Sequence, residues 1–149
     1  MQPLQFLVPL DALAALEPVI PFVIFGFVVL NILTRFLQHR RHLTQADSGD
    51  DDEAIDRWLP HTATTLGLVL ASFVFLVIEP HGGMVMSILA LSVFISDFFE
   101  YESRLVEARS KSKALERPTA AIGASVVALL YAGYQSFFYL IEPVWNAVI

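Results

Sequence analysis

The sequence predicts an all-α membrane protein, a bundle of four transmembrane helices with both termini on the outer face. Its apolar residues, 56% of the 149-residue chain, lie in four long runs with few charges. A hydrocarbon layer roughly 30 Å thick selects runs of that length. Prolines and glycines punctuate the runs, and every Lys and Arg falls on one side of them. We therefore expect one transmembrane domain, residues 1–149.

Two polar loops and one short turn separate the four predicted spans. Pro18 and Pro21 open the first span, since a missing amide donor is harmless in a first helical turn. Residues 79–83 contain a proline and two glycines that are expected to break the helix, and Glu142-Pro143 is expected to end the fourth span. The predicted spans are residues 18–37, 59–78, 84–99 and 119–141, with loops at 38–58 and 100–117.

A re-entrant hairpin of the second and third spans is the competing topology. The third span is the shortest and ends in Asp97 and Glu100. Backbone polar groups at membrane depth must pair internally, which favours two complete helices over a lipid-exposed loop.

Two helical segments are expected outside the membrane core. Residues 10–16 have room for one or two turns lying on the outer surface, with Asp11 as a cap. The third helix is expected to continue into the cytoplasm, because Glu100 and Arg104 form an acidic-then-basic pair one turn apart. Residues 47–56 are expected to form a solvated loop.

The basic residues predict the orientation. All nine lie on the side of the two long loops, and the other side has none. The positive-inside rule then makes both loops cytoplasmic and both termini extracellular, in the cytoplasmic (cell) membrane. The nine residues are Arg35, Arg40, Arg41, Arg57, Arg104, Arg109, Lys111, Lys113 and Arg117.

Four side chains are expected to contact lipid headgroups. Arg40 and Arg41 form a basic juxtamembrane pair, and Trp58 and Trp145 lie at opposite boundaries, where indole rings act as anchors. No basic residue precedes the first apolar stretch, so we expect no cleavable secretory signal.

Composition and motifs exclude several classes of function. The absence of cysteine excludes disulfides, thiolate metal sites and iron–sulfur clusters, and a net charge of −6 disfavours nucleic-acid binding. No nucleotide loop, zinc-protease motif or nucleophile elbow is present. His39, His42 and His61 could suggest a haem or metal cluster, but a haem between helices needs histidines well inside two spans.

The acidic stretch at residues 47–53, seven Arg against two Lys, and the lack of Cys are features of composition. In these features and in its four-span plan the chain resembles small uncharacterised membrane proteins of halophilic archaea. The resemblance implies a hydrated, salt-tolerant acidic surface, and it implies no function and no site residue.

Small residues recur every four positions in the second and fourth spans. Such ladders let helix backbones approach closely where lipid offers no hydrophobic drive. They serve either packing inside the bundle or a face for a second subunit. Their members are Ala63, Gly67, Ala71, Ala120, Ala124, Ala128, Ala132 and Ser136.

A polar and aromatic stripe lies beside the fourth-span ladder. Tyr131, Tyr134, Gln135 and Phe138 fall on one helix face. The stripe would either line a pocket for a lipid or quinone ring, or supply interhelical hydrogen bonds worth about 0.6 kcal/mol each.

Three glutamates that precede prolines are expected at the outer boundary. Glu17, Glu79 and Glu142 lie there near His81, and such a set could hold a divalent cation. In the alternative interpretation each Glu-Pro pair only begins or ends a helix. Glu79 and Glu142 sit at carboxyl ends, where the helix dipole disfavours a carboxylate, and this favours the metal hypothesis. No other cofactor is predicted.

Arg35 and Asp97 are expected at similar depth near the inner boundary. They would either form an ion pair that fixes helix register or each reach the headgroups independently.

Three functions are compatible with these features. The first is a non-enzymatic accessory, assembly or structural subunit that forms homo-oligomers or joins a larger membrane complex through its helices. The second is an oligomeric channel or transporter with a path lined by polar residues of several spans. The third is a membrane enzyme using the outer carboxylate metal site. The channel path would contain Asn31, Ser92, Ser96, Tyr131 and Gln135.

Overall fold

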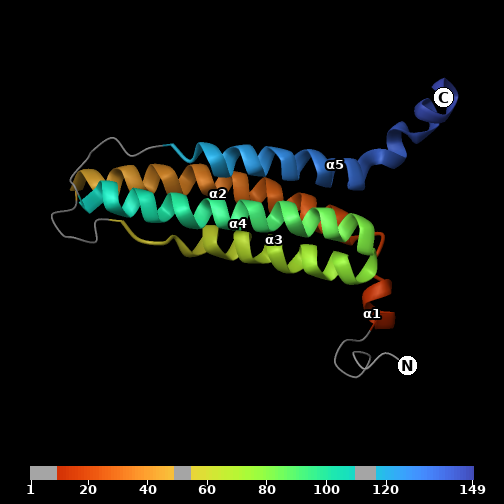
Figure 1. Ribbon diagram of the computed structural model, residues 1–149, viewed down its shortest axis with the longest axis horizontal. Coiled ribbons are helices and arrows are strands. Elements are labelled where there is room, and N and C mark those ends of the chain that lie inside the picture. Colours follow the sequence, from red (N-terminus) through yellow and green to blue (C-terminus); the bar gives the residue numbers. More distant parts are fainter. Residues whose placement is uncertain (1–9, 49–54, 110–116) are drawn as a thin grey trace.

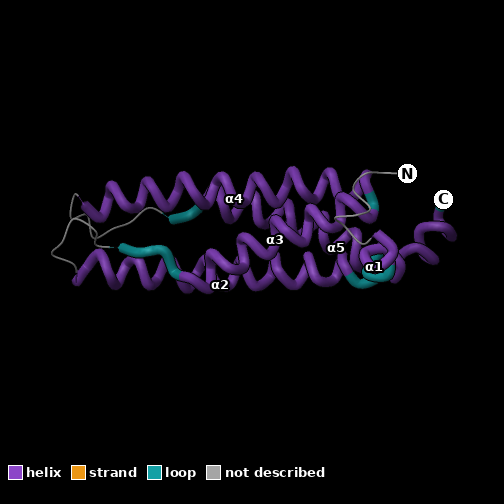
Figure 2. Tube along the Cα trace, turned by 90° about the horizontal axis from the view of Figure 1, so that it is seen from below, coloured by secondary structure: helices purple, strands orange, loops and turns teal. Residues whose placement is uncertain are grey.

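The computed structural model describes residues 10–48, 55–109 and 117–149. These residues form the helices α1 (Leu10–Ala14), α2 (Ile20–Ser48), α3 (Leu59–Ile78), α4 (Pro80–Arg109) and α5 (Thr119–Val148), and no strand occurs among them. The last four helices are each long and apolar enough to cross a membrane. They run alternately up and down, and α2 and α4 each pack against both α3 and α5 (Figures 1 and 2). The prediction of an all-helical chain with four membrane-length helices is confirmed.

The connection between α3 and α4 is shorter than predicted. Only Glu79 is non-helical, and α4 begins at Pro80. The helix therefore breaks within the predicted turn 79–83, but Pro80, Gly82 and Gly83 belong to α4 and are not the residues that break it. Proline is tolerated in a first helical turn, and the Gly82 amide donates a hydrogen bond of 2.7 Å to Glu79 Oε2. We call this the hairpin end of the bundle.

The other helix boundaries also extend beyond the predicted ones. The first part of the predicted 38–58 loop is helical, because α2 continues to Ser48 and includes Asp47. The rest of the acidic stretch lies outside the described residues. The predicted extension of the third helix is confirmed, since α4 reaches Arg109, and α1 occupies the predicted amino-terminal segment. Their positions relative to a membrane stay predictions.

The prediction that the fourth helix ends before Glu142 is also wrong. Pro143 lies inside α5, which continues to Val148. Past Phe138, however, α5 bends away from the other helices, and every residue from Tyr139 onward is exposed (Figure 1). Proline removes one backbone donor and bends a helix without always ending it.

The core of the bundle has two chemically different halves. Each long helix buries one stripe at spacings of three and four residues. Toward the hairpin end the stripes are mainly apolar, although Ser72, Ser87 and Ser136 are also buried there. The apolar members are Ile20, Ile24, Val28, Leu68, Ala71, Phe75, Met86, Ala90, Val93, Ala128 and Ala132.

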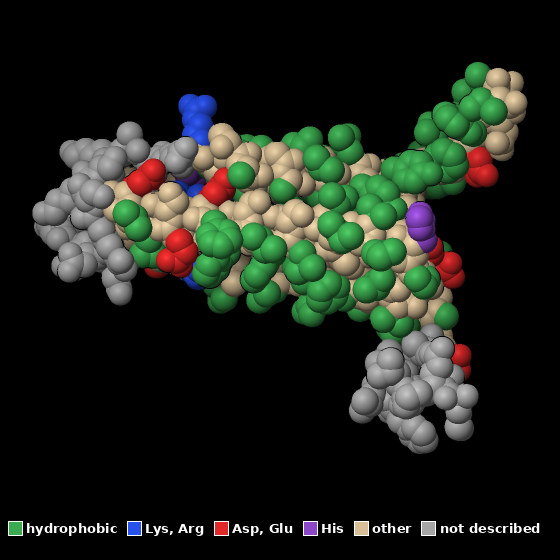
Figure 3. Space-filling view, viewed as in Figure 1, with side chains coloured by type: hydrophobic (Ala, Val, Ile, Leu, Met, Phe, Trp, Pro, Cys, Tyr) green, Lys and Arg blue, Asp and Glu red, His purple; other side chains and the backbone are tan. Residues whose placement is uncertain are grey.

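Toward the opposite end the same stripes become polar. The described Lys and Arg residues also gather there, so we call it the basic end (Figure 3). Between the two ends, hydrophobic side chains cover the surface shown in Figure 3, which suits contact with lipid. The buried polar residues of this half are Asn31, Arg35, Gln38, His42, His61, Thr65, Asp97, Arg104 and Ser125.

Gly83 allows α3 and α4 to approach closely at the hairpin end. A Cβ atom there would collide with backbone atoms of Phe75 and Leu76. We predict that Gly83→Ala destabilises the bundle by roughly 1–3 kcal/mol, because backbone atoms cannot rotate away as a side chain can.

The measurement is the Tm of the purified protein in detergent. Gly26→Ala is the matched control, since a Cβ at Gly26 meets nothing within 4 Å and alanine favours a helix. Equal Tm changes in the two variants would contradict the close approach.

Candidate functional site

A buried polar cluster at the basic half of the bundle is the candidate site. On α2 it contains Asn31, Arg35, Gln38 and His42, which follow one another at spacings of four, three and four residues. These spacings continue the buried stripe of Ile24 and Val28, so the packing of the apolar half directs the polar residues inward.

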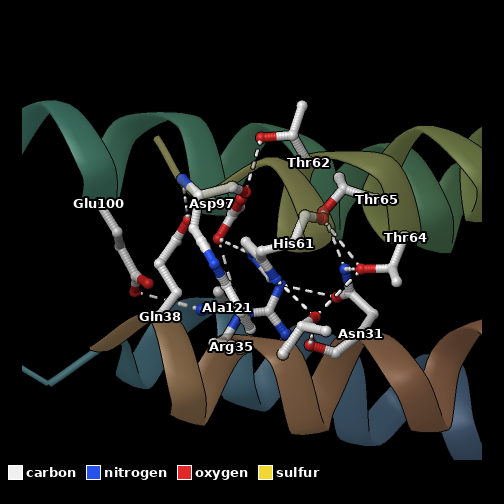
Figure 4. Close-up of polar contacts among 12 residues, drawn as sticks. Asn31, Arg35, Gln38, His61, Thr62, Thr64, Thr65, Asp97, Glu100 and Ala121 are labelled. Atoms are coloured by element: carbon white, nitrogen blue, oxygen red, sulfur yellow. Dashed lines mark hydrogen bonds and ion pairs between the residues drawn. The ribbon is translucent and has the colours of Figure 1, made fainter. Parts of the chain in front are cut away.

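The Arg35 guanidinium joins three helices at the centre of this cluster. Its Nε lies 3.6 Å from Asp97 Oδ1 on α4, and its Nη1 donates a 2.6 Å hydrogen bond to Ser125 Oγ on α5. Its Nη2 donates to Asn31 Oδ1 at 2.9 Å within α2. The structure thus places the predicted Arg35–Asp97 pair in contact (Figure 4), with Arg35 only 1% exposed.

His61 adds α3 to the cluster. Its Nε2 lies 3.0 Å from Asp97 Oδ1, the same oxygen that faces Arg35. Its Nδ1 lies 2.9 Å from Thr34 Oγ1, and the ring is 1% exposed (Figure 4). His61 lies in the first turn of α3, so it is buried inside the bundle although it is close to the end of its helix.

Short polar side chains surround His61 on the side away from Asp97. Asn31 Nδ2 donates to Thr64 Oγ1 at 3.0 Å and to Thr65 Oγ1 at 2.8 Å. The Thr34 hydroxyl lies 3.1 Å from the Asn31 carbonyl oxygen, which gives its hydrogen an acceptor other than His61. These bonds hold α2 and α3 in one register.

His42 forms a separate connection nearer the basic end. Arg104 Nε donates to His42 Nδ1 at 3.2 Å, and His42 Nε2 lies 2.7 Å from the Asp56 carbonyl oxygen. A nitrogen that accepts from a guanidinium carries no proton, so His42 is neutral and donates through Nε2. His42 and His61 therefore have different hydrogen-bond partners, and of these two only His61 pairs with a carboxylate.

A cavity of about 240 Å³ between α3 and α4 reaches the cluster. Asp97 and Thr65 line it, so the cavity reaches the residue whose carboxylate contacts His61. The remaining lining residues are Arg57, Thr62, Leu66, Phe94 and Phe98.

The exposed charges of the basic end pair across short distances. Arg41 lies 3.5 Å from Asp56, and Arg57 lies 3.5 Å from Glu102. Hydrogen bonds from Gln45 and Arg41 lower the pKa of Asp56, and the bond from Gln45 has the larger effect. Such exposed pairs contribute little to stability. Arg40, Arg41 and Trp145 are exposed and Trp58 is half-buried, and their contact with headgroups stays a prediction.

The small-residue ladders are partly inside the bundle. Ala71, Ala128, Ala132 and Ser136 are buried, Gly67 and Ala124 are half-buried, and Ala63 and Ala120 are exposed. A helix has 3.6 residues per turn, so a strict spacing of four drifts off the buried face. Ala121 and Ser125, which lie outside the predicted ladder, occupy that face instead.

The polar and aromatic stripe of α5 is connected within itself. Gln135 Nε2 donates to Tyr131 Oη at 2.9 Å, and the rings of Tyr134 and Phe138 have centroids 5.2 Å apart. Tyr134 is exposed. The cavity at Asp97 lies toward the basic end, away from this stripe.

The four residues suggested for the outer metal site are not brought together. Within the described ranges, no group of three or more His, Asp or Glu side chains is placed to hold a metal ion. Glu79 caps α4 through Gly82, and Glu142 lies on the part of α5 that leaves the bundle. Glu17 and His81 therefore lack the two partners that the hypothesis required.

The sequence contained a signal for the cluster that the analysis of spans missed. Ending the first span at residue 37 assigned His42 to a loop, whereas α2 continues to Ser48. The second helix does begin at residue 59, as predicted, but the buried face of its first turn, which contains His61, was not identified. Extending the three-and-four spacing through polar positions would have placed both on buried faces.

Comparisons with known proteins identify the family of the chain. No curated protein and no solved structure matches it. One family profile matches residues 2–149, which is nearly the whole chain. The chain therefore belongs to the family described as a domain of unknown function, DUF7313.

Proposed function

We propose that the protein is a non-enzymatic component of the cytoplasmic membrane whose activity depends on reversible protonation of the buried His61–Asp97 pair. The observation that carries this proposal is the hydrogen bonding of His61, which has a partner on each ring nitrogen. Ionisable side chains inside membrane spans are rare and usually functional.

The Thr34 hydroxyl lets His61 exist in two protonation states without movement of heavy atoms. In neutral His61, Nε2–H donates to Asp97 and Nδ1 accepts from Thr34. In protonated His61, Nδ1–H donates to Thr34 Oγ1, and the Thr34 hydrogen turns to the Asn31 carbonyl oxygen at 3.1 Å. Every donor has an acceptor in both states.

Charges of both signs lie at His61. Asp97 of α4 contacts His61 Nε2, and Arg35 of α2 faces the same carboxylate oxygen. Arg104 of α4 also acts on Asp97, and α5 contributes the neutral hydroxyl of Ser125, which accepts from Arg35. A purely structural cluster would need only neutral amides and hydroxyls, because buried charges cost more to keep. Retaining both charges and an imidazole supports a role in proton exchange.

Proton exchange is expected on one side of the membrane only. The cavity beside Asp97 lies at the basic end, which the positive-inside rule makes cytoplasmic, whereas the core toward the hairpin end is apolar. Asn31 is buried and Ser92 is exposed, so these two residues do not share a path through one bundle. A proton-responsive subunit therefore fits better than a single-bundle channel.

We predict that His61 changes protonation reversibly while the bundle stays folded. The measurement is NMR of the protein labelled with ¹⁵N-histidine in lipid nanodiscs between pH 5 and pH 9. His61 should pass between the neutral and the doubly protonated spectra, and Asp97→Asn should alter that transition because it removes the negative partner.

His42 is the internal control, because the hydrogen bond from Arg104 keeps its Nδ1 free of a proton. His61→Gln assigns the signal. If His61 holds a single protonation state across this range in a folded protein, the proposal is wrong.

A second candidate function is assembly through helix surfaces, as an accessory subunit or homo-oligomer. Ala120 and Gly123 are exposed on α5, and a Cβ at Gly123 meets nothing within 4 Å. Small exposed residues on a lipid-facing helix allow a second helix to approach.

We predict that Gly123→Leu reduces association, because a large side chain would hold a partner helix away. The measurement is native mass spectrometry after gentle extraction from the protein's own membranes. Gly26→Leu, at an equally open position of α2, is the matched control. A wild-type protein that is monomeric and without partners would exclude this candidate.

A further inference from the structure

A second cavity, of about 200 Å³, lies at the basic end between α4 and the start of α5. It is several times larger than the roughly 30 Å³ that one water molecule occupies in the liquid. Its lining contains two arginines, one carboxylate and two hydroxyl groups. The lining residues are Glu100, Ser103, Arg104, Arg117, Thr119 and Ala120.

Glu100 caps the amino terminus of α5 from the neighbouring helix. Its Oε1 accepts hydrogen bonds from the amides of Ala120 at 2.8 Å and Ala121 at 3.1 Å. Pro118, at the N-cap position, makes no side-chain hydrogen bond. Glu100 also attracts the Arg104 guanidinium electrostatically, and Glu100 Oε2 is buried without a hydrogen-bond partner.

Arg104 is the unsatisfied donor of the same cavity. It is only 3% exposed, and its Nε is used by His42. Its Nη1 is buried and has no hydrogen-bond partner. A buried charged donor without a hydrogen-bond partner costs folding free energy, so an acceptor bound next to this guanidinium would stabilise the protein.

Two residues that line the cavity therefore each have a buried polar atom without a hydrogen-bond partner, Arg104 Nη1 and Glu100 Oε2. Arg104 and Arg117 contribute two positive charges and Glu100 one negative charge, which leaves a net charge of about +1 beside a helix amino terminus. Arginine forks, hydroxyls and helix amino termini are the groups that bind phosphate.

We propose that this cavity binds a singly charged phosphate ester that also bears a hydroxyl group. The phosphate oxygens would accept from Arg104 and Arg117, and the hydroxyl would donate to Glu100 Oε2. A glycerol-type phosphodiester has both features, and either an anionic phospholipid headgroup or a soluble phosphate ester could supply it.

The depth of Arg104 makes the lipid headgroup a natural source. Arg104 follows Pro80 by 24 positions of α4, which corresponds to about 36 Å of helix. The hydrocarbon core is roughly 30 Å thick, so a bundle that spans it places Arg104 at headgroup level.

The test measures binding to the full chain in detergent by native mass spectrometry and by the shift in Tm. The probes are phosphatidylglycerol, phosphatidylcholine and soluble glycerophosphoglycerol, which is the headgroup diester of phosphatidylglycerol without its acyl chains. Phosphatidylglycerol should bind at least tenfold more tightly than phosphatidylcholine, whose headgroup lacks the hydroxyl and the net negative charge. Binding of glycerophosphoglycerol with similar affinity would assign the soluble source, and retention of the lipid alone would assign the membrane source.

Arg117→Gln and Thr119→Val should each weaken phosphatidylglycerol binding, by about tenfold for the arginine, whose charge-assisted bond is lost. These side chains are used because Arg104→Gln also breaks the bond to His42 and could unfold the basic end. Arg40→Gln, an exposed arginine of the same end that does not line the cavity, is the control. Equal binding by all three variants, or no preference for phosphatidylglycerol, would overturn the proposal.

Discussion

The contact between the Arg35 guanidinium and Asp97 is the constraint around which the rest of the bundle is arranged. Arg35 bonds to α2 and α5 while facing the carboxylate of α4, and that carboxylate in turn faces His61 of α3. Removing one partner of a buried pair leaves an uncompensated charge and typically costs about 3–5 kcal/mol. Each of the four long helices is therefore tied to one point. The register of their buried stripes follows from that point as much as from apolar packing.

The two halves of the core have different physical roles. In lipid, the apolar half gains little from burial itself, so close contacts such as Gly67 against Phe27 and Gly83 against α3 must hold it together. The polar half is held by hydrogen bonds that are specific in geometry and sensitive to protonation. A change of charge at His61 would thus act on the half of the bundle that has the weaker apolar packing.

Several features of the fold could be predicted from the sequence because each depends on local composition. Long apolar runs located α2 to α5, and the acidic and basic residues after Asp97 indicated the extension of α4. The errors came from reading Pro and Gly as helix breakers at Pro80, Gly83 and Pro143. In the structure, Pro80 occupies a first turn, Gly83 serves a close helix approach, and Pro143 only accompanies a bend.

The candidate site was less predictable because it depends on which helix faces meet. Arg35 and Asp97 could be paired from their depth alone, but His61 and Ser125 join them only through the relative rotation of α3 and α5. The rotation of a helix is set by its whole buried stripe, in which a polar residue gives no apolar signal. The outer glutamates illustrate the converse, since similar depth did not bring their side chains together.

The two proposed sites share α4, and this has a consequence for their coupling. Asp97, Glu100 and Arg104 follow at spacings of three and four residues, so they lie along one face. Asp97 and Arg104 are separated by about 10 Å along the helix axis. This is close to the Debye length of about 10 Å at 0.1 M ionic strength, and buried charges are screened less than exposed ones. A negative ligand beside Arg104 would offset its positive charge, which otherwise acts on the Asp97 carboxylate that contacts His61. Because such coupling is reciprocal, a change of charge at the His61–Asp97 pair would change the binding of the same ligand by an equal factor.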